Sequence, residues 1–349
     1  MDSSSTASAL PISGVSQPFL GGRTLKTTVL AVLVAVMVLF CGDALAQGVK
    51  LKPGDVIVAH GQVPGGIRVY DGEKNYQLKA VIDRPEWTLS AGPSARSVEI
   101  GPDDHIWVTD ANAYPERGDF KSGELYEFDP NFRFIGSFPI QLHCGDAVGR
   151  GIRGFTFSPK GSIFITGSWQ DPEVGIVNLL LEIAPDRGAT FSCVRLFAGL
   201  FSLNDLEMGK DGFVYASGWN GRGVIRFRPN DTEGFEVVSC EGMGIATGEL
   251  VYLTSGEIIV ADQERRTITI FTPTTEEFGP LCVGTFFPGE SGPTALDVWG
   301  RRVYGAEEAR TGGEIHIIPL ADIPNEPLKV IDTTQGGLPP GASSIAVVR

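Results

Sequence analysis

Hydrophobic and polar residues alternate in short stretches that recur along most of the chain. The stretches SVEIGPDDHIWVTD at 97–110 and DLEMGKDGFVYASG at 205–218 each place two alternating segments around a polar turn. Alternation over about four to eight residues indicates a strand with one buried face, and two such strands around a short turn indicate a hairpin. The same pattern recurs at 154–167, 249–262 and 295–308.

A third strand is predicted at a regular distance after each hairpin. We predict third strands at 67–71, 125–130, 180–185, 224–229, 268–273 and 315–319. Fourth strands are predicted at 132–138, 235–240 and 281–287. Units of about 40 to 50 residues with four strands each are typical of β-propeller blades. We therefore predict an all-β fold, a six-bladed β-propeller.

The two ends of the pattern supply complementary parts of one blade. GDVIVAHG at 54–61 matches the second strand of a repeat without a first strand before it, and ASSIAVVR at 342–349 matches a first strand. Pairing of 345–348 with 56–59 would complete the blade and remove the open edges of the array. The predicted domain is therefore a propeller over 47–349, closed by its N- and C-terminal strands. A stack of hairpins without ring closure is the alternative.

Residues 1–46 precede this pattern and read as a signal peptide. Basic residues come before an apolar run at 29–41, and Ala44 and Ala46 are the small residues that a signal peptidase accepts. The run is short for a membrane-spanning helix, which needs roughly 17 to 25 residues. We predict cleavage before Gln47 and a secreted or periplasmic location. Contact with a membrane through an uncleaved signal segment is the alternative.

Charge and cysteine content narrow the partners and the compartment. The formal net charge is -14, from 28 Lys and Arg against 42 Asp and Glu, so a nucleic acid is not an expected partner. Export implies an oxidising compartment for Cys144, Cys193, Cys240 and Cys282. Four thiols allow three pairings, and the spacing selects none of them. Four buried free thiols are the alternative.

The repeats resemble a known class of propellers. Their order of apolar strand, DG-type turn and aromatic second strand, as in DLEMGKDGFVYASG, resembles NHL-repeat and gluconolactonase/regucalcin-like six-bladed propellers. The resemblance extends over about residues 54–349. It implies the fold, but such propellers include lactonases, lyases and plain binding modules. The fold therefore does not select a function.

Aligning the repeats brings one residue of each blade to the start of the first strand, at one mouth of the central channel. We call this set the mouth ring: Arg96, Arg153, Asn204, Gly248, Thr294 and Ser343. Arg96 and Arg153 come from adjacent blades, and two guanidinium groups side by side match a carboxylate or a phosphate.

The resemblance also implies a metal site at this level. In gluconolactonase-like enzymes a Glu, two Asn and an Asp at these positions bind calcium, and Asn204 with Asp205 matches one of those positions. Calcium takes about six to eight oxygen ligands. The other mouth-ring positions offer two arginines and no carboxylate, which is a departure from the pattern of the enzymes.

A second ring is predicted at the same mouth, where the second strands end. This strand-end ring comprises His60, Asp110, Gly167, Gly218, Asp262 and Glu307. Asp110, Asp262 and Glu307 could bind a metal ion together with Asn204. The alternative is that each Asp accepts backbone N–H groups of the turn that follows it.

Loops after the second strands carry aromatic residues to this mouth. Tyr114, Trp169 and Trp219 are predicted to form a wall that suits a flat apolar or sugar-like ligand, with ordinary packing between loops as the alternative. No nucleophile elbow, phosphate loop or zinc-protease motif is present.

Two functions remain open at this stage. The first is binding of a small molecule or a protein partner at the loop-rich mouth, through Arg96, Arg153, Asn204, Asp205 and the aromatic wall. The second is calcium-dependent hydrolysis of lactones or similar esters. Calcium is the one cofactor that the second function needs, and the sequence does not decide whether the protein is an enzyme.

Overall fold

The structure is a computed structural model, and it describes residues 48–60, 66–82, 95–110, 123–140, 143–144, 147–148, 150–171, 175–184, 191–198, 203–218, 223–229, 234–238, 240–244, 246–274, 282–287, 292–306, 314–320, 329–332 and 342–349. The predicted signal peptide at 1–46 lies outside these residues, so its cleavage stays a prediction. Among the residues described, no helix has the length and apolar character needed to cross a membrane.

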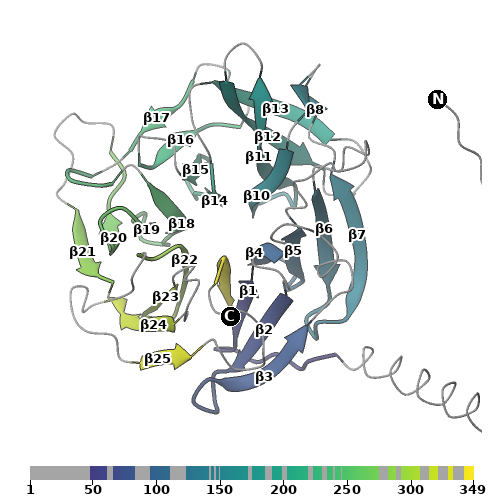
Figure 1. Ribbon diagram of the computed structural model, residues 1–349, viewed down its shortest axis with the longest axis vertical. Helices are drawn as coiled ribbons and strands as arrows, with labels where there is room; N and C mark the ends of the chain where they lie inside the picture. Colours follow the sequence, from purple (N-terminus) through teal and green to yellow (C-terminus); the bar gives the residue numbers. More distant parts are fainter. Residues whose placement is uncertain are drawn as a thin grey trace, which may run out of the picture. The chain divides into compact units, whose positions relative to one another are not determined.

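Six antiparallel sheets of four strands each surround a central axis (Figure 1). The strands of the first three blades, from the centre outward, are β26 (Ser344–Val347), β1 (Val56–His60), β2 (Gly66–Asp71) and β3 (Gln77–Ile82) in blade one; β4 (Ala95–Ile100), β5 (Ile106–Asp110), β6 (Gly123–Phe128) and β7 (Phe134–Ile140) in blade two; and β10 (Arg150–Phe157), β11 (Ile163–Asp171), β12 (Gly175–Ile183) and β13 (Phe191–Ala198) in blade three.

The other three blades follow in chain order. Their strands are β14 (Asp205–Met208), β15 (Val214–Ser217), β16 (Ile225–Phe227) and β17 (Glu236–Val237) in blade four; β18 (Thr247–Tyr252), β19 (Ile258–Asp262), β20 (Thr267–Phe271) and β21 (Val283–Phe286) in blade five; and β22 (Ala295–Trp299), β23 (Arg302–Ala306), β24 (Glu314–Pro319) and β25 (Lys329–Asp332) in blade six. The predicted all-β six-bladed propeller is confirmed. A short hairpin that the sequence did not predict, β8 (His143–Cys144) with β9 (Ala147–Val148), follows blade two.

The chain ends close the ring as predicted. β26 pairs antiparallel with β1, with Val347 opposite Val56 and Ser344 opposite Ala59. The ladder covers 344–347 and thus begins one residue earlier than the predicted 345–348. Val348 continues the pairing outside the strand, because its N–H donates to the Asp55 carbonyl at 2.9 Å. The alternative of an open stack of hairpins is wrong.

The core lies between neighbouring blades. One cluster packs Ile57 and Val69 of blade one against Val98, Val108 and Tyr126 of blade two, all fully or almost fully buried. Each blade is covered on both faces by its neighbours, so its second strand is apolar on both sides. This explains why all five residues of β1, β5 and β19 are buried.

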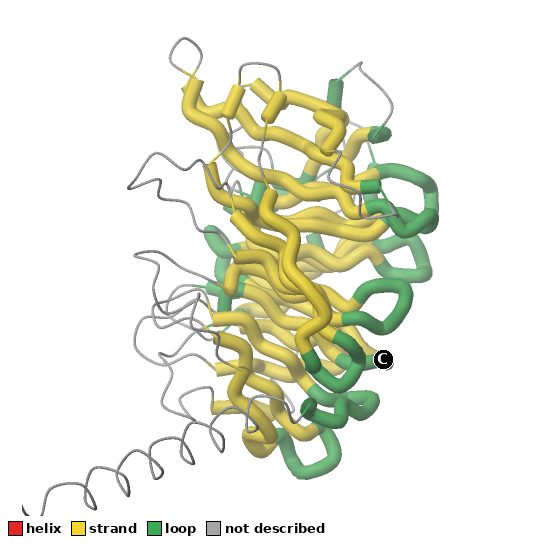
Figure 2. Tube along the Cα trace, turned by 90° about the vertical axis from the view of Figure 1, so that its right-hand side faces the viewer, coloured by secondary structure: helices red, strands yellow, loops and turns green. Residues whose placement is uncertain are grey.

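Blades two to five share one turn between their first and second strands. In blade four, Gly209 N donates to Phe213 O at 2.8 Å and Gly212 N to Gly209 O at 3.0 Å. The residue at the position of Gly212 has a positive φ in each of the four blades: Asp104, Gly161, Gly212 and Gly256. Glycine adopts this conformation without steric cost, which explains the Gly-containing turns of the repeats. These turns lie on the face that also carries Arg349, at the right of Figure 2.

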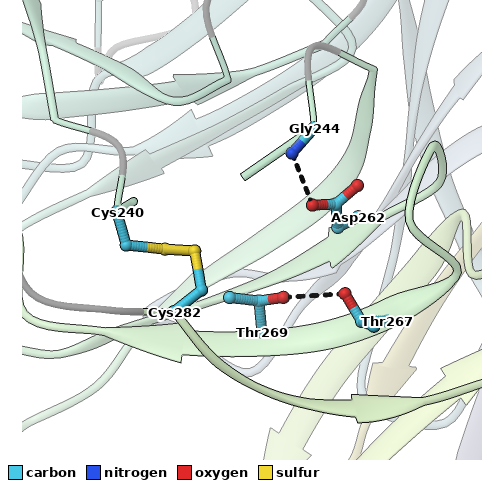
Figure 3. The surroundings of a disulfide bond; sticks show 6 residues. All are labelled: Cys240, Gly244, Asp262, Thr267, Thr269 and Cys282. Carbon is cyan, nitrogen blue, oxygen red and sulfur yellow. Dashed lines mark hydrogen bonds between the residues drawn. A yellow bond between two sulfur atoms is a disulfide. The ribbon is translucent and has the colours of Figure 1, made fainter. Parts of the chain in front are cut away.

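A disulfide joins the outer edges of two neighbouring blades. Cys240 follows β17 of blade four, and Cys282 precedes β21 of blade five (Figure 3). Their Cα atoms are 5.1 Å apart, within the ordinary range for a disulfide. The structure therefore shows that Cys240 pairs with Cys282, which the spacing of the cysteines could not decide. The side chains of Cys144 and Cys193 lie outside the described part of the chain.

Candidate functional site

The structure brings the mouth ring together at one end of the channel. Arg96, Asn204, Gly248, Thr294 and Ser343 line one small cavity of about 30 Å³, together with Ser97, Glu249 and Gln263. A space of this size holds about one or two water molecules. The ring therefore constricts the channel, and its role in ligand binding stays a prediction.

Most side chains of the mouth ring connect neighbouring blades. Arg153 Nη1 donates to Asn204 Oδ1 at 2.8 Å, which joins blades three and four. Ser343 Oγ donates to the Ala95 carbonyl at 2.8 Å, which joins blades one and two. Thr294 Oγ1 donates to the Ala342 carbonyl at 3.2 Å, between blades six and one.

Gly248 occupies the mouth-ring position of blade five for a steric reason. A Cβ atom there would overlap the carbonyl oxygen of Thr294 in blade six. That carbonyl accepts the N–H of Glu249 at 2.8 Å, which holds the two backbones close together. Only glycine allows this approach. The mouth ring therefore has no side chain from blade five.

The surroundings of Asn204 do not fit the calcium site that the resemblance implies. Asn204 Oδ1 is the atom that would bind the ion, and it accepts a hydrogen bond from Arg153. A guanidinium group at this distance repels a divalent cation. Asp205 does not line the mouth-ring cavity but a second cavity further along the channel. Among the described residues, this ring thus supplies too few oxygen ligands for calcium.

The strand-end ring contains a carboxylate that is engaged with backbone. Asp262 is fully buried. Its Oδ2 accepts from Gly244 N at 2.7 Å (Figure 3), and its Oδ1 accepts from Arg265 N at 3.0 Å. This is the turn-capping arrangement that stood as the alternative to a metal ligand. Asp110 is 1% exposed, and Glu307 lies outside the described residues. A metal ion bound by these side chains stays a prediction.

The predicted aromatic wall falls where the structure gives no side chains. Tyr114 and Trp219 lie outside the described residues. Trp169 belongs to β11, but only its backbone is described. The aromatic wall therefore also stays a prediction.

One compact group of metal-ligand types lies in blade two. In the described chain, only Asp103, His105 and Glu127 bring three such ligand atoms within 4.8 Å of one another. His105 Nδ1 lies 2.6 Å from Glu127 Oε1 and 3.4 Å from Asp103 Oδ2. Asp103 also accepts the backbone N–H of His105 within the turn between β4 and β5. Asp211 accepts the N–H of Phe213 in the same way in blade four, where Phe213 takes the position of the histidine. We therefore interpret the group as a structural turn in which the His105 ring contacts two neighbouring carboxylates.

The larger cavity lies at the other end of the channel. It measures about 280 Å³ and is bordered by the shared turns of blades two, three and four, at Pro102, Pro159 and Lys210. Five carboxylates line it, all from innermost strands: Glu99, Asp205, Glu207, Glu249 and Asp297. We call this cavity the acidic chamber. Glu249 also lines the mouth-ring cavity, so the two cavities are adjacent levels of one channel.

Three of these carboxylates accept a backbone N–H from the first strand of the next blade. Asp205 Oδ2 accepts from Leu250 at 2.9 Å, and Glu249 Oε2 accepts from Leu296 at 2.7 Å. Asp297 Oδ2 accepts from Val347 at 2.6 Å. Hydroxyl oxygens take the same position elsewhere, since Thr156 accepts from Met208 N and Ser344 from Val98 N. These side chains link the innermost strands of neighbouring blades, which are not paired with one another in a sheet.

Burial raises the pKa of every carboxyl group in the chamber, and neighbouring carboxylates add to this for all of them except Asp297. Burial raises the pKa of Asp205 to about 7, although the N–H groups of Leu250 and Leu206 oppose the change. Burial and the Asp205 carboxylate raise the pKa of Glu207 to about 8. The pKa values of Glu99 and Glu249 lie well above the ordinary value for the same two reasons, and burial raises that of Asp297.

Sequence reasoning missed the acidic chamber, although its signal was present. In the aligned repeats, all five carboxylates occupy the first or third position after the mouth-ring residue, and these positions line the channel. The repeats were aligned at their strand ends and not at these inner positions. An acidic residue inside an otherwise apolar strand was the available signal.

Comparisons with known proteins give a likeness of fold. No family model and no curated protein sequence matches this chain. Among solved structures, a chain of the nidogen/laminin complex has a TM-score of 0.59 at 13% identity, covering 83% of this chain and 97% of its own. A protein of unknown function from Bacteroides caccae has a TM-score of 0.56 at 11% identity, covering 85% and 100%.

The periplasmic gluconolactonase of Pseudomonas aeruginosa has a TM-score of 0.53 at 13% identity, covering 81% of this chain and 84% of its own. Identities this low carry no information on ligands or reactions. The chain is thus similar in fold to six-bladed propellers of the nidogen and gluconolactonase types, as the repeats indicated.

Proposed function

We propose that this protein is an exported binding propeller, which holds an anionic group of a small molecule or of a partner protein at the mouth ring. One observation carries the proposal: Asn204 is hydrogen-bonded to Arg153 and shares a small cavity with Arg96. Arg96 and Asn204 line the same small cavity, and Arg153 donates to the Asn204 amide oxygen.

Two guanidinium groups from adjacent blades suit a carboxylate or a phosphate. Each guanidinium has five N–H donors in a fixed plane, so a bond to Asn204 is compatible with a second bond to an anion. Ionised partners at a water-poor constriction give stronger hydrogen bonds than neutral ones. The distant surface charge of the protein opposes this only weakly, because salt screens it beyond about 8 to 10 Å.

Binding is favoured over hydrolysis by the same contacts. Calcium-assisted lactone hydrolysis needs an ion at Asn204, and Arg153 takes up the oxygen that would hold it. The disulfide between Cys240 and Cys282 supports export, since such bonds persist in oxidising compartments.

Titration calorimetry with citrate and with inorganic phosphate tests the proposal. Wild type should bind at least one of them, and Arg96→Gln and Arg153→Gln should each weaken that binding at least tenfold. Arg301→Gln is the matched control, because Arg301 is exposed in the turn between β22 and β23, at the end of β22 opposite to Thr294. The proposal would be overturned if wild type bound neither anion, or if both mouth-ring variants bound it as tightly as wild type does.

A further inference from the structure

When its carboxyl groups are ionised, the acidic chamber carries far more negative than positive charge. Five carboxylates line it, and the cationic side chains beside them are Lys210 and Arg349. Arg349 is 69% exposed, and its Nη2 lies 3.6 Å from Asp297 Oδ1. An exposed side chain at this distance compensates a buried carboxylate only in part. The chamber therefore attracts a cation from solution.

A second observation points to a ligand. Asp205 is 2% exposed, and its Oδ1 has no hydrogen-bond partner in the described part of the chain. Its other oxygen is held by Leu250 N, so the carboxylate is fixed in position and cannot turn to satisfy both atoms at once. A buried acceptor without a partner costs about 1 to 3 kcal/mol. A donor inside the chamber would remove that cost.

The spacing of the carboxylates opposes a single bare metal ion. A divalent ion needs oxygen ligands at about 2.0 to 2.6 Å, which places those oxygens within about 5 Å of one another. No three of the five chamber carboxylates bring oxygen atoms within 4.8 Å of one another. They come from blades two, four, five and six and so surround the cavity from different sides.

The volume and the remaining lining match an organic cation. A cavity of about 280 Å³ is near the lower limit of small-molecule sites. Between the carboxylates lie apolar side chains, among them Phe157, Leu296 and Ile345. Methylene groups can pack on these side chains while ammonium groups reach the carboxylates.

We propose that the acidic chamber is a binding site for an aliphatic diamine or polyamine. One ammonium group donates to Asp205 Oδ1, and a second pairs with Glu207 of the same blade and with Glu99 of blade two. The site opens at the face of the shared turns and is distinct from the mouth ring.

Calorimetry at low ionic strength and pH 8.5 with spermidine, and separately with calcium chloride, tests this proposal. Spermidine should bind wild type, and Asp205→Asn and Glu207→Gln should each weaken it at least tenfold. Glu236→Gln is the matched control, because Glu236 is an exposed carboxylate on the outer strand of the same blade, paired with Arg226. It should leave spermidine affinity unchanged.

A variant that gains affinity adds a test in which a change in binding cannot be explained by loss of the fold. Arg349→Gln removes an exposed cation beside Asp297 and should tighten spermidine binding several-fold. Arg96→Gln should not change it, since Arg96 lines the other cavity. The proposal is overturned if wild type does not bind spermidine, if the two chamber variants bind it as wild type does, or if calcium binds and spermidine does not.

Discussion

Asp205 of blade four and Leu250 of blade five are joined by a hydrogen bond of 2.9 Å from the Leu250 N–H to Asp205 Oδ2. The other oxygen of the same carboxylate is buried without a hydrogen-bond partner from the described chain, and Asp205 lines the acidic chamber. One side chain thus links two blades and lines the cavity, and two substitutions separate these roles.

Asp205→Ala should lower the free energy of unfolding by about 1 to 3 kcal/mol, because it leaves the buried Leu250 N–H without its acceptor. Asp205→Asn keeps an oxygen in that position and should cost less than half as much. Urea denaturation of both variants measures the difference. Equal destabilisation by the two substitutions would show that the link to blade five does not depend on the side-chain oxygen.

Stability without ligand should fall as the pH rises from about 4 to about 8. The raised pKa values of Asp205, about 7, and Glu207, about 8, mean that these groups hold protons in the folded state that the unfolded chain has already released. The folded state therefore binds more protons across this window, and the free energy of unfolding decreases. The charged groups facing them are Glu99, Glu249, Asp297, Lys210 and Arg349.

Thermal melts at pH 5 and pH 8.5 check this effect. Wild type should melt at a lower temperature at pH 8.5, and Glu207→Gln should reduce the difference between the two conditions. Glu236→Gln, with its exposed carboxylate, is again the control and should leave the difference as it is in wild type. A melting temperature that rises with pH would contradict the assignment of these groups.

Gly248→Ala should lower the free energy of unfolding by about 1 to 3 kcal/mol, since the added methyl group overlaps the Thr294 carbonyl of the next blade. Gly136→Ala in β7 is the matched control, because nothing lies within 4 Å of a Cβ atom at that position. Denaturation of both variants gives the comparison. A Gly248→Ala protein as stable as the Gly136→Ala protein would contradict the close approach of blades five and six.

Loss of the Cys240–Cys282 disulfide should destabilise the fold by about 2 to 4 kcal/mol, since the bond closes a long loop and joins blades four and five. The double variant Cys240→Ser/Cys282→Ser tests this in a denaturation experiment. Reductant should lower the stability of wild type and have a smaller effect on the double variant. An unchanged stability in the double variant would contradict a structural role for the bond.

The repeating pattern of strands predicted the architecture because each blade must bury both faces and pair its strands in the same way. Closure by 56–59 with 344–347 followed from two incomplete repeats at the ends. The repeating pattern did not predict how the side chains are arranged in the channel. Whether Asn204 faces an ion or a guanidinium depends on the neighbouring blade, which the pattern within one repeat does not specify.

The disulfide and the acidic chamber also could not be predicted from the pattern within one repeat. Cys240 and Cys282 come from different blades, and so do the five chamber carboxylates. Spacing along the chain carries little information on such pairs, since they meet only after the blades pack. Asp205 was predicted as a partner of Asn204, but the two side chains line different cavities because they are adjacent residues of an extended segment.

We propose above all that the mouth ring binds a ligand without hydrolysing it. The most direct measurement is the hydrolysis rate of glucono-lactone with wild type and Asn204→Ala, in calcium and in chelator. We expect the rate of buffer alone in all four conditions, because the Asn204 oxygen already accepts a hydrogen bond from the Arg153 guanidinium. A calcium-dependent rate above buffer in wild type that is lost in Asn204→Ala would contradict the account.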